Sequence, residues 1–232
     1  LWKALQGCGM SSFLLHLIRD LHTGTTARVR MQNELSSPFV TSSGVRQGCI
    51  LAPALFCCAI DWLMRQCSDK FGVNVGSLRL TDIDYADDGV LFTSNPDSWS
   101  DILRSYESAA SSMGLHTNWL KTKLQNIGSG PDPTPVSMGA QTVEPVTQFT
   151  YLCSDVDSDG YSTPEMHRCL GIANSAVGQL DRIWRQRKLS LHTKLRIYSS
   201  LVLSVLLYGS ETWTMRKTDS ARLQAFHMTS QR

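Results

Sequence analysis

Residues 78–93 read LRLTDIDYADDGVLFT and hold four carboxylates within seven residues, namely Asp82, Asp84, Asp87 and Asp88. Runs of β-forming residues at Leu78–Asp84 and Gly89–Thr93 flank the four residues between them, which predicts a tight hairpin. Like charges at this spacing repel one another, so they form either a solvated turn or a site that shares a cation. The apolar flanks favour core strands whose turn presents a carboxylate from a rigid edge.

The doublet Asp87-Asp88 is the predicted metal site. Adjacent residues of an extended strand point to opposite faces, so the two carboxylates do not bind one ion equally. We predict Asp87 as the principal ligand and Asp88 as an auxiliary one. Oxygen ligands without a neighbouring His or Cys select Mg²⁺ or Mn²⁺ over Zn²⁺. A charged turn without a ligand is the alternative on these residues alone.

The elements around the hairpin predict an α+β protein. Helical periodicity is found at Ser11–Leu21, Ala54–Cys67 and Ser98–Met113, and from Thr163 onward. Strand patterns are found at Thr25–Met31, Pro38–Thr41, Thr122–Ile127, Val136–Val143 and Thr147–Leu152. The first two strands form a hairpin that turns at Asn33-Glu34, and Gly128–Pro135 is a surface loop. We therefore expect an α+β body in residues 1–162 and a helical region in residues 163–232.

Composition excludes several classes of protein. Of the 232 residues, 42% are hydrophobic, with 16 Gly and 8 Pro, which excludes collagen-like and disordered chains. The longest apolar run, Leu201–Tyr208, is far shorter than the roughly 20 residues of a membrane helix. We see no signal peptide, and the seven cysteines lack CxxC pairs, which favours a reducing compartment. We expect a protein of the nucleus or cytoplasm.

Charge is distributed unevenly along the chain. Residues 1–163 contain 11 Lys and Arg against 16 Asp and Glu, whereas residues 164–232 contain 11 against 4. The basic second part suits a polyanion, and the acidic first part suits metal cations. A helical region with a solvated basic face is the alternative explanation.

Five stretches, in order along the chain, carry a resemblance to one family. They are Gly44–Cys49 with Pro53 and Phe56, Tyr85–Asp88, Gly114–Leu115 with Asn118 and Lys121–Lys123, Phe149–Leu152 with Asp159-Gly160, and Leu206–Trp213. Their letters resemble the boxes GVRQGCPLSPLLF, YADD, GLxxNxxKTK, FxYLGS…DG and LLYGSETW of reverse transcriptases from LINE-type (non-LTR) retrotransposons. One four-letter box is weak evidence, but five in the right order cover nearly the whole chain.

The resemblance implies an RNA-directed DNA polymerase with a palm and a thumb. Such a palm holds two divalent ions between the primer 3′-hydroxyl and a deoxynucleoside triphosphate. Asp87 and Asp88 are the implied ligands, and Lys121 is implied to neutralise or protonate the pyrophosphate leaving group. Contacts to nucleotide and template are implied for Arg46, Gln47, Gly48 and Tyr85. The thumb follows the RNA template and DNA primer through Arg182, Arg185, Arg187, Lys188, Lys194 and Arg196.

The chain departs from the family pattern in several places. The first catalytic box, a strand with an aspartate, is absent, and Leu1-Trp2 looks like the pair that follows it. Ile50, Ala52 and Cys153 replace the usual Pro, Ser and Gly. We therefore expect a fragment that is inactive by itself, since loss of a metal ligand removes orders of magnitude in rate. A catalytically dead remnant with weak nucleic-acid binding is the alternative.

A calcium-binding loop is a rival interpretation of another segment. Residues 155–160 read DVDSDG and copy the first half of an EF-hand loop. The twelfth position of that loop requires a bidentate Glu, and here it is Met166, with Glu165 one place early. We therefore favour a turn that leads into a helix.

Overall fold

The computed structural model describes residues 1–42, 44–46 and 48–231, and its contacts divide the chain into two compact units. The first unit comprises Leu1–Trp119 with Val136–Thr142, and the second comprises Leu120–Pro135 with Val143–Arg232. Each unit has its own hydrophobic core. The α+β class predicted from the sequence is confirmed, because helices and short, mostly antiparallel strands make up both units.

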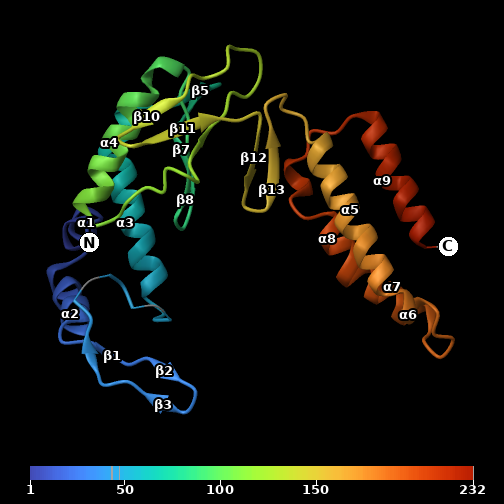
Figure 1. The fold of residues 1–232 in the computed structure, drawn as a ribbon, viewed down its shortest axis with the longest axis horizontal. Helices are drawn as coiled ribbons and strands as arrows, with labels where there is room; N and C mark the ends of the chain where they lie inside the picture. Colours follow the sequence, from blue (N-terminus) through green and yellow to red (C-terminus); the bar gives the residue numbers. More distant parts are fainter. Residues whose placement is uncertain (43, 47, 232) are drawn as a thin grey trace. The chain divides into compact units, whose positions relative to one another are not determined.

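Two helices form the core of the first unit. Helices α3 (Ala52–Cys67) and α4 (Trp99–Ser112) lie side by side, with the central hairpin beside α3 (Figure 1). Leu63 and Ile102 are almost completely buried between them. Pro53 in the first turn of α3 suits a helix start, as the sequence predicted.

The central stretch folds into two hairpins where the sequence predicted one. Strands β5 (Val73–Val75) and β6 (Leu78–Leu80) pair with each other, and β7 (Asp82–Tyr85) pairs with β8 (Asp88–Leu91). The predicted strand over residues 78–84 is therefore broken at Thr81. The break arises because β6 and β7 bond to different partners, which only the folded chain determines.

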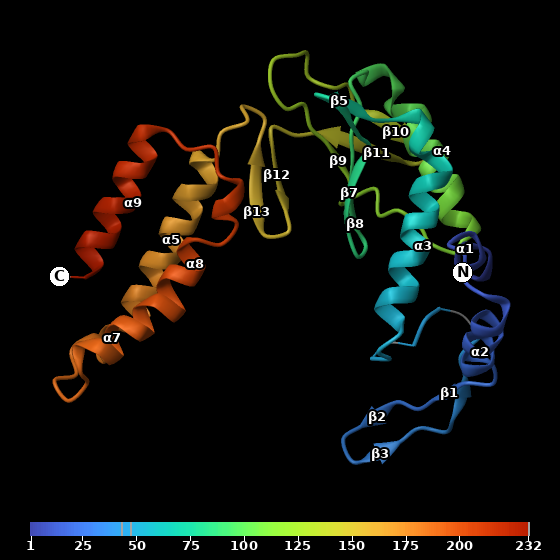
Figure 2. The ribbon, with the colours of Figure 1, turned by 180° about the vertical axis from the view of Figure 1, so that it is seen from behind.

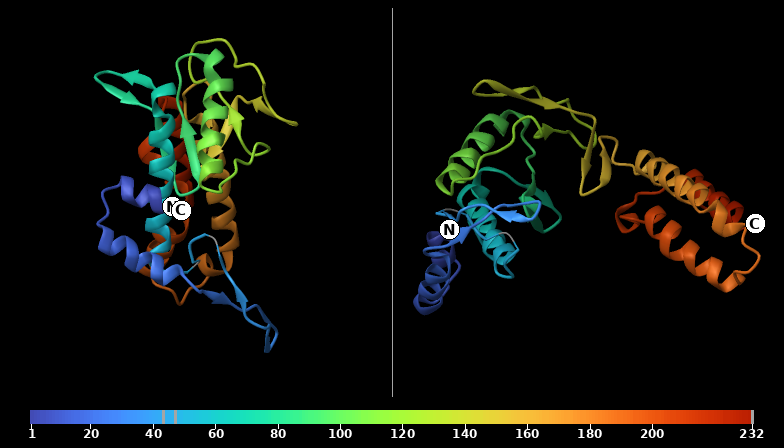
Figure 3. Two further views of the ribbon diagram at one scale, coloured as in Figure 1. Left: turned by 90° about the vertical axis from the view of Figure 1, so that its left-hand side faces the viewer. Right: turned by 60° about the horizontal axis from the view of Figure 1, so that its bottom comes forward.

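The N-terminal part of the first unit holds two helices and an arm. They are α1 (Trp2–Gly7), α2 (Ser12–His22), and the strand pairs β1 (Thr26–Ala27) with β4 (Phe39–Val40) and β2 (Arg30–Met31) with β3 (Glu34–Leu35). Helix α2 is capped by Ser11, whose hydroxyl accepts a hydrogen bond from the Leu14 amide. The arm extends away from α3 (Figure 3) and turns at Gln32-Asn33, one residue before the predicted turn.

The second unit begins with short strands. Strand β9 (Lys123–Leu124) pairs in parallel with Glu144 and Pro145 at the end of β11 (Gln141–Pro145). Strand β10 (Val136–Met138) and the first two residues of β11 belong to the first unit. The predicted strand over residues 136–143 is thus two strands, and the loop over residues 128–135 contains neither helix nor strand. Strands β12 (Gln148–Tyr151) and β13 (Ser154–Asp157) then form a hairpin.

The remainder of the second unit is helical, as predicted. Its elements are α5 (Thr163–Gln179), α6 (Asp181–Trp184), α7 (Leu191–Tyr198), a π-helical turn over residues 199–203, α8 (Ser204–Leu206), and α9 (Lys217–Ser230). Helix α5 packs against both α8 and α9 (Figure 2). Buried Cys169, Tyr198 and Val202 belong to their common core. All seven cysteines of the chain are free thiols.

The turn of the β12–β13 hairpin contains two residues in the left-handed backbone region. Leu152 has φ 48° and Cys153 has φ 63°, which is the pattern of a two-residue hairpin turn usually made by Asn-Gly. Left-handed backbone costs a residue with a Cβ roughly 1–2 kcal/mol. Cys153 therefore carries strain at the position where the family has Gly.

We expect Cys153→Gly to stabilise the protein by up to about 1 kcal/mol, because the relieved strain exceeds the unfolded-state entropy that Gly adds. Urea unfolding measures the difference. Cys153→Ser is the matched control, since it removes the thiol and keeps the Cβ in the left-handed region. A glycine variant that is no more stable than the serine variant would contradict this account.

Candidate active site on the β7–β8 hairpin

The β7–β8 hairpin closes through a two-residue turn, Ala86-Asp87. Ala86 has φ 55°, and Tyr85 lies directly opposite Asp88 across the ladder. The turn is thus tighter than the four-residue connection predicted from the sequence. Asp87 lies in the turn and Asp88 begins β8, and both residues are exposed. The doublet therefore projects from the end of a rigid two-stranded element.

The strand register separates the four carboxylates into two groups. Asp82 and Asp84 alternate with Ile83 and Tyr85, so they occupy the other face of β7. Asp88 lies opposite Tyr85 and shares its exposed face, because directly paired residues point to the same side. The four carboxylates that crowd together in the sequence do not form one site.

Asp84 turns towards the helices of the first unit. Its ladder partner is Gly89, where a Cβ would lie only 2.9 Å from Asp84 Oδ1 and 3.3 Å from the Met64 methyl group. Met64 is buried on α3. The hydrogen of Gly89 therefore leaves the space into which the Asp84 carboxyl group fits.

The environment of Asp84 raises its pKa to about 7. Burial of the carboxyl group is the largest cause, followed by the charge of Asp82, a hydrogen bond with Asp82, and the charge of Asp61. The residue as a whole is exposed, but its carboxyl group lies against α3. Burial, together with the Asp84 charge, also raises the pKa of Tyr106 to about 12.

The chemistry of the doublet fits a hard divalent ion. Mg²⁺ is commonly held by one or two carboxylates, with water and substrate phosphates completing its coordination. Asp87 and Asp88 supply exposed carboxylate oxygens of that kind. No group of three or more His, Cys, Asp or Glu suited to a metal ion occurs in residues 1–42, 44–46 and 48–231. The doublet can therefore supply only part of a coordination shell.

The other predicted nucleotide contacts are Arg46, Gln47 and Gly48, which precede α3 in the sequence, and Tyr85 on β7. Arg46 and Gly48 are exposed, and Gly48 has φ 83°, a left-handed conformation that favours glycine. The Arg46 carbonyl accepts a hydrogen bond from the Cys49 amide, which closes a turn. Gln47 lies outside the described residues. Tyr85 is 66% exposed on the hairpin, so its ring is available to a ligand.

Lys121 belongs to the second compact unit, where it is exposed and precedes β9. Its predicted action on the leaving group stays a prediction.

The predicted nucleic-acid contacts lie on α6, the following loop and α7. Arg182, Arg185, Arg187, Lys188 and Arg196 are exposed. Arg185 pairs with Asp181 at 2.8 Å, and Lys194 is half-buried, with its ammonium group donating to the Trp184 carbonyl at 2.5 Å. Lys194 therefore has a structural bond that sequence reasoning did not predict, while the exposed arginines present charge to solvent.

The EF-hand interpretation is wrong. Asp155 accepts hydrogen bonds from Gln148 and Thr150 and pairs with Arg168, so its oxygens are used within the protein. Asp157 accepts from the Asp159 amide and shapes the turn, as expected of a turn before a helix.

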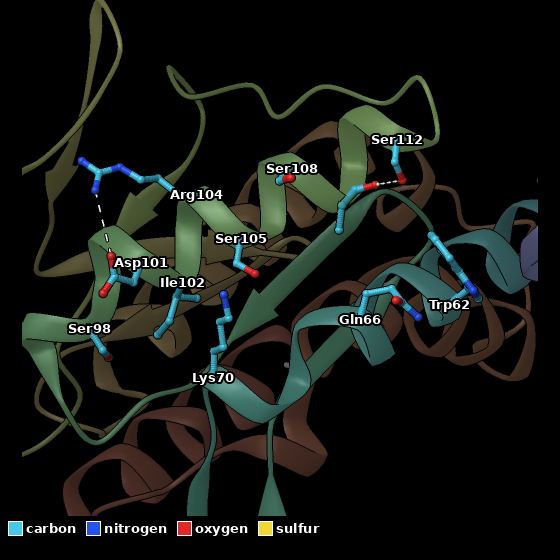
Figure 4. A pocket seen from close by; sticks show the side chains of 11 residues that line it. Trp62, Gln66, Lys70, Ser98, Asp101, Ile102, Arg104, Ser105, Ser108 and Ser112 are labelled. Atoms are coloured by element: carbon cyan, nitrogen blue, oxygen red, sulfur yellow. Dashed lines mark hydrogen bonds and ion pairs between the residues drawn. The ribbon is translucent and has the colours of Figure 1, made fainter.

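A groove of about 770 Å³ lies between α3 and α4 (Figure 4). Trp62, Gln66 and Lys70 line it from the α3 side, and the serines of α4 line it from the other. None of the predicted site residues contributes to it. The groove is therefore not part of the carboxylate site.

We expect Asp84→Asn to remove a pH dependence of stability. A carboxyl group whose pKa is raised on folding binds its proton more tightly in the folded state, so stability falls as pH rises from about 4 to about 7. Thermal unfolding at pH 5 and pH 8 measures the effect. The stability of the variant relative to that of the wild type should be greater at pH 8 than at pH 5. Asp101→Asn is the control for loss of an exposed carboxylate. An equal pH response of wild type and Asp84→Asn would refute the proposed burial.

Comparison with known proteins identifies the family. The family model described as reverse transcriptase (RNA-dependent DNA polymerase) matches residues 3–156, and a domain of unknown function matches residues 176–208. A transposon-derived protein of Caenorhabditis elegans is 29% identical over 168 residues, which cover 69% of this chain and 58% of that protein.

The retrovirus-related Pol polyprotein of the type-2 retrotransposable element R2DM of Drosophila melanogaster is 25% identical, over 94% of this chain and 22% of the polyprotein. This chain thus spans 58% and 22% of the two relatives. Within the described residues, no helix is both long and apolar enough to cross a membrane. The order of sequence boxes, the carboxylate hairpin and the matched family model agree, and the chain belongs to the reverse transcriptase family.

Proposed function

We propose that this chain is the palm and thumb portion of a LINE-type retrotransposon enzyme that extends a DNA primer on an RNA template. The observation that carries the proposal is the Asp87-Asp88 doublet at the tip of a rigid hairpin, inside the matched family region. Residues 1–162 act as the palm and residues 163–232 as the thumb. A reducing compartment, nucleus or cytoplasm, suits the seven free thiols.

The predicted site residues have separate roles in nucleotidyl transfer. Asp87 and Asp88 hold Mg²⁺ or Mn²⁺, which supplies charge neutralisation for the triphosphate and activation of the primer hydroxyl. Arg46 binds and orients the incoming deoxynucleoside triphosphate, and Gly48 allows its close approach to the backbone. Gln47 and Tyr85 contact nucleotide and template. Lys121 neutralises or protonates the pyrophosphate leaving group.

The limited number of carboxylates at the predicted metal site bears on whether this chain is active by itself. Within the described residues, no group of three or more His, Cys, Asp or Glu could hold a metal ion. We propose that these 232 residues alone do not extend a primer and that activity needs an aspartate from outside them. The alternative is a catalytically dead remnant. It would keep the basic helices and bind nucleic acid weakly through them, but it would not catalyse primer extension.

Primer extension on RNA tests the catalytic role of the hairpin. In the longest protein that contains this chain, we expect Asp87→Asn to lower the rate about 100-fold or more, because a ligand of the reacting centre is lost. Asp88→Asn should lower it less, and Asp69→Asn, which removes an exposed carboxylate elsewhere, should leave it unchanged.

Full activity of the Asp87→Asn protein would show that the ligand assignment is wrong. Primer extension by the 232 residues alone would show that no further aspartate is needed. An inactive full protein that still binds RNA–DNA hybrid would favour the remnant.

Binding to an RNA–DNA hybrid tests the basic helices. The affinity should fall steeply with salt, and Arg187→Ala should weaken binding and reduce the slope of log K against log salt by about 1. Fluorescence anisotropy at several salt concentrations measures both. Arg65→Ala is the control, because Arg65 is an exposed arginine of the first unit paired with Asp61. A flat salt response would exclude phosphate contacts.

A further inference from the structure

The turn Leu152-Cys153 is held by two side chains from the helical region. The Tyr208 hydroxyl donates to the Leu152 carbonyl at 3.0 Å, and Arg168 Nη2 donates to the Cys153 carbonyl at 2.6 Å. These donors lie 56 and 15 residues away along the chain. Both carbonyls of a strained turn are therefore fixed from outside the hairpin.

A buried carboxylate fixes Arg168 in turn. Glu165 is 1% exposed and accepts from Arg168 through both oxygens, at 2.8 and 2.7 Å. Its Oε2 also accepts from the Asp155 amide at 2.9 Å, which ties β13 to α5. Burial raises the pKa of Glu165, but the hydrogen bonds from Arg168, Asp155 and Cys169 outweigh it and lower the pKa. Arg168 and Glu165 therefore form a bidentate, charge-assisted pair with a defined geometry.

The segment around Tyr208 lies beside the turn. Gly209 has φ 69°, and a Cβ there would lie 3.6 Å from the hydroxyl oxygen of Ser154, directly after the turn. The hairpin ladder itself already closes the turn by pairing Tyr151 with Ser154. The bonds from Tyr208 and Arg168 are thus not needed to form the hairpin, and they fix its direction relative to α5 and α8.

From this geometry we infer that Arg168 and Tyr208 are positioning residues that lock the β12–β13 turn to the helical region, so that hairpin and helices meet nucleic acid as one preorganised body. The inference rests on the proposed function of the helical region. Backbone strain persists where surrounding contacts over-determine it, which marks a turn whose position matters. A body that is already ordered loses less conformational entropy on binding.

Tyr208→Phe tests the lock, because it removes one hydroxyl from a side chain that is 52% exposed. Amide hydrogen exchange of residues 152–155 should quicken severalfold, while the unfolding midpoint should fall only slightly, as expected for the loss of one hydrogen bond. Affinity for an RNA–DNA hybrid should fall by up to about fivefold, because the loosened turn must be reordered on binding at a cost no larger than that of one hydrogen bond. The salt slope should stay unchanged, because no phosphate contact is lost. Tyr161→Phe, which removes a hydroxyl of similar exposure, is the control.

Arg168→Lys provides a second variant. It keeps the positive charge but loses the pair of hydrogen bonds that the Arg168 guanidinium donates to the two oxygens of Glu165. It should also quicken exchange in the turn. Unchanged exchange in Tyr208→Phe would overturn the lock, and quickened exchange with unchanged affinity would overturn its role in binding. A wild-type protein that binds no hybrid would refute the proposed function instead, and exchange alone would then decide whether the lock exists.

Discussion

The register of the β7–β8 hairpin is the constraint on which the carboxylate arrangement depends. Gly89 opposite Asp84 leaves room for a carboxyl group against Met64, and it is the glycine of the β7–β8 ladder. A slip of one residue would turn every side chain of β7 to the other face. The Asp84 carboxyl group would then point away from α3, and Tyr85 would be turned towards the helices. The position of Asp87 at the tip follows from the same register.

Among the described residues, three hairpin turns use left-handed residues with a Cβ: Gln32 in β2–β3, Ala86 in β7–β8, and Leu152 with Cys153 in β12–β13. The Ala86 side chain in β7–β8 is small. In β12–β13 two successive residues are left-handed, and side chains from α5 and the segment after α8 hold their carbonyls. The larger strain thus coincides with the larger number of external bonds. Strain of this kind is retained only where other contacts enforce it.

Buried carboxylates organise the helical unit. Glu165 and Asp219 are each 1% exposed, and a buried charge without partners is strongly destabilising. Asp219 accepts from the Arg216 amide and the Thr163 hydroxyl, so one side chain joins the starts of α9 and α5. These partners are far apart in the sequence. The helices are therefore oriented by a few polar contacts in addition to their apolar core.

The sequence by itself determined the family, the α+β class, the helices from Thr163 onward and the hairpin around Asp87, because these depend on local periodicity and on contiguous boxes. It could not determine that β6 and β7 separate at Thr81, or that Asp84 faces the helices, since both depend on pairing partners. Sequence reasoning also did not predict the roles of Glu165, Arg168 and Tyr208. Tyr208 lies in one of the five boxes, and Glu165 is an acidic residue within the apolar pattern of a helix, and these were the only signals. Their roles depend on hydrogen bonds across as many as 56 residues, and only the tertiary structure brings such groups together.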